Sequence, residues 1–408
     1  MSAGLGSGAL RSAITTVRYR TIHGSSTMNK RREHPSTLAV QALGRVDSET
    51  GAIVPPIHPS VAYERAPDGS HPGGHSYTRD QNPTYDQPEA LLAQLEGGQG
   101  ALLFSSGMAA AATVFEVLDA GDHVVAPRQM YWTIRRWLQE LEERGRISLD
   151  LVPNGDQAAF EAALRPGRTR VVWVETPSNP SCAITDIAAT AEAAHTAGAR
   201  VVVDSTLCTP VHCRPIQHGA DLVVHSATKQ LNGHADVLAG ALVTARRDEA
   251  WERIEHDRAH RGAVLGPFEA WLLLRGMRTL YLRAVHSAAS AQLLAEWLVA
   301  QPAVLDVFYP GLLSHSGHDI AARQMSDGFG MLLSFRLAAG EAAARRVAGG
   351  LRLFKNATSL GGVESLVEHR APVEGPDTPV PDDLLRLSIG IEAVDDLRAD
   401  LEHALAGL

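Results

Sequence analysis

The hydrophobic positions of the chain follow a repeated strand and helix pattern from residue 84 onward. Four runs of β-branched residues predict strands buried on both faces: HVVAP at 123–127, VVWVET at 171–176, RVVVDST at 200–206 and DLVVHSAT at 221–228. A fifth run, ALLF at 101–104, follows a helix that we expect to open at Asp86 and Pro88 and to close at Gly97. Because helical stretches separate these strands, the pattern predicts an α/β fold with a mostly parallel sheet covered by helices.

The pattern changes after about residue 268. A Leu- and Ala-rich helical region at 269–301 is followed by the strand MLLSFRL at 331–337, a helix at 340–350 and the strand LLRLSIGIE at 384–392. Between the last two elements we expect a Pro-rich acidic loop over 371–383. These residues predict a smaller C-terminal α/β domain.

Composition narrows the class of protein. With 45% apolar and 20% charged residues among 408, the chain is typical of a globular protein, and no apolar run reaches the length of a membrane span. A net charge of −9 argues against nucleic acid or an anionic membrane as a partner. The three cysteines are too few for a disulfide framework, so we expect a cytoplasmic location. We predict no metal site, because Cys208, His212 and Cys213 lie in one segment without a distant ligand pair.

The first 32 residues contain no acidic residue and are rich in Arg, Ser and Gly. This composition is typical of an organellar transit peptide, but also of a disordered extension or of a start site placed ahead of Met28. We favour a disordered extension over residues 1–33, because no amphipathic face stands out.

Lys229 stands at the carboxyl end of a predicted strand, where ligands bind in open α/β sheets. Burial there lowers the pKa of an amine and makes it available to form a Schiff base. Ser226 and Thr228 add hydroxyl groups suited to a phosphate. Taken alone, Lys229 is better interpreted as an ordinary lysine in the first turn of a helix.

Two further strand ends carry compatible chemistry. Asp204 can hold the ring nitrogen of pyridoxal phosphate protonated, although a helix N-cap is an equally good interpretation. Gly107 and Met108 open a helix whose N–H groups favour a phosphate, although such turns are common in α/β proteins. Because these signals fall at successive strand ends, together they favour a pyridoxal-phosphate site.

Ordered motifs then carry a resemblance that covers the chain from about His34 to its C-terminus. They are HPSTLAV (34–40), GAIVPPI (51–57), YTRDQNPT (77–84), FSSGMAA (104–110), ETPSNP (175–180), VVDSTLCTP (202–210), HSATKQLNGH (225–234), YPGLLSH (309–315), SLGGVESL (359–366) and RLSIGIE (386–392). The chain resembles the Cys/Met-metabolism family of pyridoxal-phosphate enzymes, which includes cystathionine γ-lyase, cystathionine γ-synthase, methionine γ-lyase and cystathionine β-lyase. The resemblance implies the type I, aspartate-aminotransferase-like fold, with an N-terminal arm at 34–75, a cofactor-binding domain at 76–268 and a small domain at 269–408.

The resemblance also implies roles for the matching residues. Lys229 would hold the cofactor covalently and move protons between substrate carbons, while Asp204 would pair with the ring nitrogen. Tyr131 would stack on the ring and act as an acid or base, and Asn179 would contact the ring hydroxyl. The phosphate would be bound by Ser226, Thr228, Gly107 and Met108, joined by Tyr77 and Arg79 from a neighbouring subunit.

On the substrate side, the resemblance makes Arg386 the carboxylate anchor, with Ser359 beside it. Three departures from the family pattern lie near the expected position of the substrate side chain. Trp132 follows the stacking tyrosine where a glycine is usual, and Thr358 stands where enzymes that use cystathionine commonly carry Glu. The segment EHRAPVEGPDTPVP at 368–381 replaces the usual HPA.MTH stretch.

The function that the resemblance implies is γ-elimination or γ-replacement on an L-amino acid, in sulfur amino-acid transsulfuration of the cystathionine γ-lyase or γ-synthase type. The departures leave open an enzyme of specialised metabolism with an unusual γ substituent, a β-elimination, and, remotely, a catalytically silent binding protein. Because Tyr77 and Arg79 would act across a subunit boundary, we expect a homo-oligomer, a dimer of dimers with shared active sites.

Overall fold

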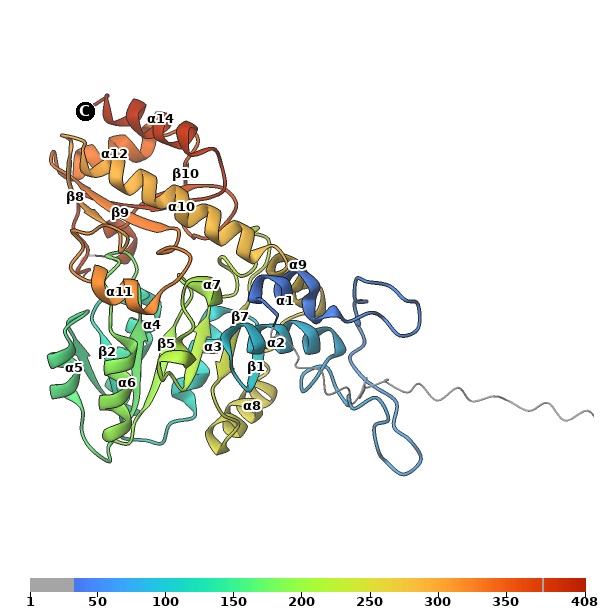
Figure 1. Cartoon of the computed structure of the whole chain (residues 1–408). Helices are drawn as coiled ribbons and strands as arrows, with labels where there is room; N and C mark the ends of the chain where they lie inside the picture. Colours follow the sequence, from blue (N-terminus) through green and yellow to red (C-terminus); the bar gives the residue numbers. More distant parts are fainter. Residues whose placement is uncertain (1–32, 376–377) are drawn as a thin grey trace, which may run out of the picture.

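The computed structural model describes residues 33–375 and 378–408, which contain two sheets (Figure 1). The larger sheet has helices on both faces, and the smaller has α10 (Leu280–Val299), α12 (Glu341–Gly350) and α14 (Val394–Leu405) on one face. The predicted extension over residues 1–33 lies outside the described residues except for Glu33. Within the described ranges no helix has the length and apolar character needed to cross a membrane.

The larger sheet has the strand order β1-β7-β6-β5-β4-β2-β3. Its strands are β1 (Gly100–Phe104), β2 (Asp122–Pro127), β3 (Ile147–Val152), β4 (Thr169–Glu175), β5 (Arg200–Asp204), β6 (Leu222–His225) and β7 (Gly240–Thr244). Strands β6, β5, β4, β2 and β3 run parallel, which confirms the mostly parallel sheet, whereas β7 lies antiparallel between β6 and β1. The hydrophobic pattern does not reveal β3 or β7, because Ser148 and Asp150 interrupt β3 and β7 opens with two small residues.

Helices separate most of these strands along the described chain. They are α1 (Pro35–Gln41), α2 (Pro83–Glu96), α3 (Gly107–Glu116), α4 (Trp132–Glu143), α5 (Gln157–Ala163), α6 (Ile187–Thr196), α7 (Thr209–His212), α8 (Glu249–Arg261), α9 (Pro267–Met277), α10 (Leu280–Val299), α11 (His318–Gln324), α12 (Glu341–Gly350), α13 (Ala371–Glu374) and α14 (Val394–Leu405), with short 3-10 helices at Ala42–Gly44 and Pro215–His218. The predicted start of α2 at Asp86 and Pro88 is wrong. The helix begins at Pro83, because the Asn82 side chain accepts a hydrogen bond from the Thr84 N–H at 2.9 Å.

Alternate residues of the central strands face two different helix layers. Val202 of β5 packs in a cluster with residues of α3 and α4, whereas Val201 and Val203 pack with residues of α5 and α6. Burial on both faces explains why these strands read as continuous β-branched runs. Parallel pairing of β4, β5 and β6 brings the carboxyl ends of these strands to the same edge of the sheet.

The smaller sheet has the order β10-β11-β12-β9-β8. Its strands are β8 (Val304–Phe308), β9 (Leu332–Leu337), β10 (Lys355–Asn356), β11 (Leu366–His369) and β12 (Leu384–Ser388). Helix α10 joins the two parts, because its Leu280 packs in the core of the larger part and its Leu294 in that of the smaller part (Figure 1). The domain boundary at residue 268 stays a prediction.

The segment 371–383 differs from the predicted loop because the short helix α13 opens it. Glu374 at the end of this helix accepts a hydrogen bond from Arg370 Nε at 3.1 Å, an i,i+4 pair that stabilises a helical turn. The buried pair therefore provides a physical reason for a helix in a sequence rich in proline.

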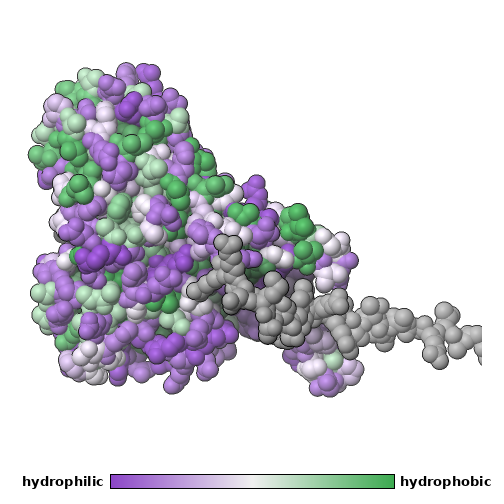
Figure 2. Space-filling view, viewed as in Figure 1, coloured by the Kyte–Doolittle hydropathy of each residue, from purple (hydrophilic) through white to green (hydrophobic). Residues whose placement is uncertain are grey.

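Residues of the predicted arm (34–75) extend away from the large sheet in loops (Figure 1). The arm carries six exposed hydrophobic side chains: Val40, Val46, Ile53, Val54, Ile57 and Val61. Figure 2 shows hydrophobic and hydrophilic surface side by side on the same face of the molecule. Such a concentration of exposed apolar residues is typical of a surface that contacts another protein.

Candidate active site

A cavity of about 320 Å³ lies beyond the carboxyl ends of the parallel strands and is lined by residues of both parts of the chain. It brings together all the predicted site residues except Tyr77 and Arg79. Those that line it are Gly107, Met108, Tyr131, Trp132, Asn179, Asp204, Ser226, Thr228, Lys229, Thr358, Ser359 and Arg386. Their separation in sequence and convergence in space make this cavity the candidate active site.

Lys229 follows β6 and lies mostly buried in the cavity. Its Nζ donates a hydrogen bond to Ser359 Oγ at 2.8 Å. Burial, followed by the positive charge of Arg386, lowers the pKa of the Lys229 amine to about 8. The site thus holds a lysine whose neutral, nucleophilic form is accessible near physiological pH.

Ser359 has a backbone φ of +97°, a conformation that a non-glycine residue rarely adopts. This backbone aims the Ser359 carbonyl at Arg386 Nη2, at 3.0 Å, while its hydroxyl accepts the bond from Lys229. Strain of this kind persists where the surroundings impose it, as at functional sites.

Two buried carboxylates lie side by side at the ends of β5 and β4, where Asp204 pairs in register with Glu175. Burial raises the pKa of Asp204, and burial together with the nearby Asp204 charge raises the pKa of Glu175. The Asp204 carboxylate accepts a hydrogen bond from the Thr206 N–H at 3.0 Å. A cationic group beside these two carboxyl groups would lower the free energy needed to ionise them.

Glu175 is a site residue that the sequence interpretation missed. Its carboxylate accepts hydrogen bonds from the backbone N–H of Tyr131, at 2.7 Å, and from that of Asn179, at 2.8 Å. It therefore fixes the positions of two residues predicted to touch the cofactor. The sequence did contain a signal for Glu175. It stands at the end of a predicted strand in ETPSNP, as Asp204 stands at the end of the next strand.

The N-terminus of α3 faces the cavity opposite Ser226. A Cβ added at Gly107 would lie 2.7 Å from Ser226 Cβ, so only glycine permits this approach of the helix to the Ser226 loop. Unpaired N–H groups and the helix dipole make this end suited to a phosphate. The Thr228 hydroxyl donates to the Ala239 carbonyl at 3.1 Å, so its proton is already engaged within the loop.

These residues fit pyridoxal phosphate. The glycine-opened helix end suits the phosphate, and the Lys229 amine suits an aldehyde. The buried carboxylate of Asp204, whose pKa is raised by burial, suits a protonated ring nitrogen, which would supply the cation that the carboxylate pair lacks.

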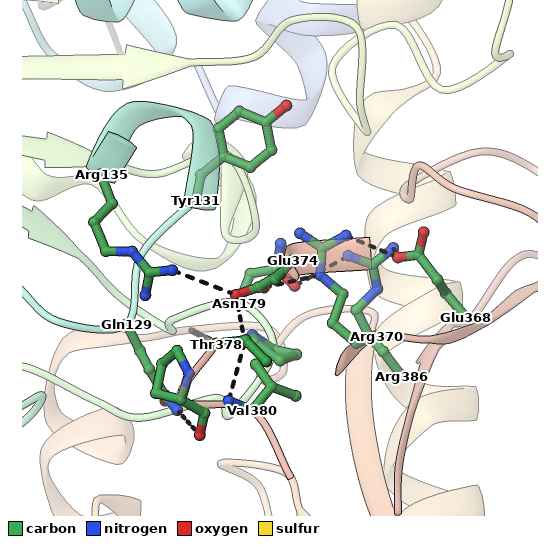
Figure 3. A network of polar contacts seen from close by, with 12 residues as sticks. Gln129, Tyr131, Arg135, Asn179, Glu368, Arg370, Glu374, Thr378, Val380 and Arg386 are labelled. Carbon is green, nitrogen blue, oxygen red and sulfur yellow. Dashed lines mark hydrogen bonds and ion pairs between the residues drawn. The ribbon is translucent and has the colours of Figure 1, made fainter. Parts of the chain in front are cut away.

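Arg386 lies on β12, with a side chain that is 3% exposed. Its Nη1 donates to Asn179 Oδ1 at 3.1 Å, and its Nη2 forms an ion pair with Glu368 Oε2 at 2.6 Å (Figure 3). Burial lowers the pKa of Arg386 to about 10, which leaves it charged at physiological pH. A buried guanidinium in a cavity is suited to a carboxylate ligand.

Residues of all three departures from the family pattern line the cavity. Trp132, the first residue of α4, and Thr358 line it together with Val373 from the rewritten segment. Arg370 of the same segment also lines the cavity and was not singled out in the sequence.

Tyr77 and Arg79 do not line the cavity of their own chain. Both are exposed, and the Arg79 guanidinium lies 5.7 Å from the centre of the Tyr77 ring. The predicted contribution of these two residues to a phosphate site requires a second copy of the chain.

Comparison with known proteins gives a consistent result. The family model described as Cys/Met metabolism PLP-dependent enzyme matches residues 36–406. Cystathionine gamma-synthase of Mycobacterium tuberculosis is 45% identical over 377 residues, covering 91% of this chain and 96% of the relative. L-methionine gamma-lyase of Pseudomonas putida is 42% identical over 371 residues, covering 87% and 93%. The crystal structure of cystathionine gamma synthase from Xanthomonas oryzae in complex with cystathionine has a TM-score of 0.88 at 39% identity, covering 92% of this chain and 98% of the other.

Proposed function

The chain belongs to the family of Cys/Met metabolism PLP-dependent enzymes, and from this premise we propose that it removes or replaces the γ substituent of an L-amino acid in transsulfuration of the cystathionine γ-synthase or γ-lyase type. The observation that carries the proposal is the convergence of Lys229, Asp204 and Arg386 in one cavity. Pyridoxal phosphate, when bound, supplies an electron sink for the negative charge that develops on the substrate.

In this proposal Lys229 holds the cofactor and, once released, moves protons at the substrate carbons. Its lowered pKa of about 8 supports this role, because the amine can both accept and return a proton near neutral pH. Ser359 holds Nζ at 2.8 Å and orients the amine toward the cavity.

Asp204 is proposed to bind the protonated ring nitrogen and Asn179 the ring hydroxyl. Tyr131 is proposed to cover the ring and to give a proton to the departing γ group; the Glu175 bond to its backbone N–H fixes the start of α4 from which the side chain projects. The phosphate is assigned to Gly107, Met108, Ser226 and Thr228, with Tyr77 and Arg79 from another copy of the chain. Thr228 would exchange its bond to the Ala239 carbonyl for one to the phosphate.

A second candidate function is supported by Trp132, Thr358 and Val373, which all line the cavity. An indole at the start of α4 reduces the space available for a substituent that carries its own amino-acid group. The alternative is therefore a lyase that acts on an unusual γ substituent, with β-elimination as a further possibility.

A substrate panel tests these proposals. We expect the purified protein to turn over L-cystathionine or an O-acyl-L-homoserine with a kcat/KM about tenfold or more above that for β-substituted amino acids, because the proposed chemistry requires a γ leaving group. Release of the γ group and formation of 2-oxo acid are measured for each compound. Turnover of β-substituted substrates alone would contradict a γ reaction, and a preference for γ-halo amino acids would favour the second candidate.

We also propose that the active unit is a homodimer at least, within a dimer of dimers. Support comes from the exposed Tyr77 and Arg79 and from the exposed hydrophobic residues of the arm, which a second copy would cover. The cytoplasmic location predicted from the low cysteine count stays a proposal.

Mixed subunits test the shared site. Arg79→Ala and Lys229→Ala are each expected to be inactive, but random hybrids should recover up to about a quarter of wild-type activity, because half of the dimers are mixed and one of their two sites is intact. As a matched control, mixing Asp204→Ala with Lys229→Ala should recover nothing, since both changes affect the cavity of one chain. Equal recovery of activity in the two mixtures would contradict an active site shared between subunits.

A further inference from the structure

Arg386, the proposed carboxylate anchor, already has an anionic partner. Glu368 Oε2 lies 2.6 Å from Arg386 Nη2, and both side chains are more than nine-tenths buried. A substrate carboxylate must therefore bind a guanidinium whose charge is largely compensated by Glu368. An isolated neutral pair of this kind would give little net attraction for a second anion.

Arg370 changes this balance. Its Nη1 donates to the same oxygen, Glu368 Oε2, at 3.0 Å, so two guanidiniums share one carboxylate (Figure 3). Arg370 is 3% exposed and lines the cavity. It gives Glu368 a cationic partner of its own, and Glu368 no longer has to be compensated by Arg386 alone.

The remaining partners of Arg370 hold it in position. Its Nε donates to Glu374 Oε1 at 3.1 Å. The other oxygen of Glu374 accepts a hydrogen bond from the Thr378 hydroxyl at 2.9 Å and lies 3.9 Å from Arg135 Nη2 of α4. Glu374 is thus compensated in part by Arg135, which belongs to helix α4 of the larger part of the chain.

Within the described residues, the charges of the side chains that form ion pairs in this cluster do not cancel. Three guanidiniums, those of Arg135, Arg370 and Arg386, face two carboxylates, those of Glu368 and Glu374. One positive charge is left over, which matches one bound carboxylate. Without Arg370 the cluster would be neutral before the substrate binds.

We propose that Arg370 is a positioning residue that keeps Glu368 from competing with the substrate carboxylate for Arg386. The inference rests on the proposed function in that it takes Arg386 as the carboxylate anchor. It assigns a role to a residue of the rewritten segment 368–381. The role concerns every amino-acid ligand, whatever its γ substituent.

Binding of unreactive ligands to the holoenzyme tests the proposal without turnover. L-Norleucine carries the α-carboxylate, whereas n-pentylamine is the same molecule without it. Arg370→Gln should raise the dissociation constant of L-norleucine about tenfold or more, as expected for loss of a charged partner. The dissociation constant of n-pentylamine should change by less than about twofold. Dissociation constants are obtained from the change in cofactor absorption and checked by calorimetry.

The decisive variant combines Arg370→Gln with Glu368→Gln. Because Glu368→Gln also removes the carboxylate that competes for Arg386, the double variant again has one surplus positive charge. The affinity for L-norleucine should therefore recover most of its loss. Glu374→Gln, which adds to the surplus, should bind L-norleucine at least as tightly as wild type. A purely structural role predicts the opposite in both cases, because each variant removes a further buried partner.

Arg336 on β9 provides the matched control. Its guanidinium forms two hydrogen bonds to the Asp383 carboxylate, at 2.7 and 2.9 Å, and the residue does not line the cavity. Arg336→Gln should leave both dissociation constants unchanged. The proposal is overturned if Arg370→Gln binds L-norleucine like wild type, if it weakens n-pentylamine in parallel, or if the double variant binds no better than the single one. Should this binding pattern hold while no γ-substituted amino acid is turned over, the proposed function fails and the role of Arg370 stands.

Discussion

Replacing Lys229 by alanine is expected to lower kcat by about 10³- to 10⁴-fold or more, because the same amine is proposed to hold the cofactor and to transfer protons. The purified wild type should be yellow and should retain its cofactor through gel filtration. The variant should lose the absorption band of the covalently held cofactor, and added pyridoxal phosphate should not restore it.

The lysine content of the chain makes this test unusually sharp. The sequence contains three lysines, Lys30, Lys229 and Lys355, and Lys355 lies exposed on β10. Lys355→Ala is therefore the matched control, which should keep the absorption band and the activity. Borohydride reduction followed by peptide mapping must place the cofactor on the peptide of Lys229; recovery on either other lysine would refute the assignment.

The central part of the fold follows from the sequence because its strands are buried on both faces. Residues such as Val201, Val202 and Val203 belong to two different cores, so the run contains no polar interruption and is easily recognised. Strands β3 and β7 lack that signature. Their place in the sheet depends on neighbours far away in the sequence, as when Gly240 of β7 pairs with Phe104 of β1.

The cofactor side of the cavity could likewise be predicted from the sequence, because strand ends in an open α/β sheet meet at one edge. Asp204, Lys229 and Gly107 could therefore be grouped before the fold was known. The part of the cavity proposed to bind the substrate carboxylate could not be predicted in this way. Glu368 and Arg386 are neighbours because β11 and β12 pair in register, and Arg370 joins them only through contacts that the spacing of residues does not predict.

The resemblance assigns roles to matching residues but says little where the chain departs from the pattern. Arg370 lies in the segment 368–381, where the chain departs from the pattern, so the resemblance assigns it no role. The role proposed for Arg370 rests on charge and distance, because two guanidiniums share the buried Glu368 carboxylate beside a cavity proposed to bind another anion.

Arg386→Lys is expected to weaken kcat/KM for every amino-acid substrate by a similar factor. A carboxylate bound by a guanidinium fork in a shielded site contributes about 2–4 kcal/mol, and a lysine ammonium recovers only part of that because it offers a point charge without the fork. The buried Glu368 sharpens this expectation, because a more flexible cation can turn toward that carboxylate and away from the substrate.

Changes at Trp132 and Thr358 should behave differently from Arg386→Lys, because both residues line the wall expected to face the γ substituent. Trp132→Gly and Thr358→Ala are expected to alter the order of preference among substrates while cofactor absorption stays intact. The measurement is kcat/KM for at least three substrates with different γ groups in each variant. A substrate-selective loss in Arg386→Lys, or a uniform loss in both wall variants, would contradict this division, since all substrates share the α-carboxylate and differ only beyond the β carbon.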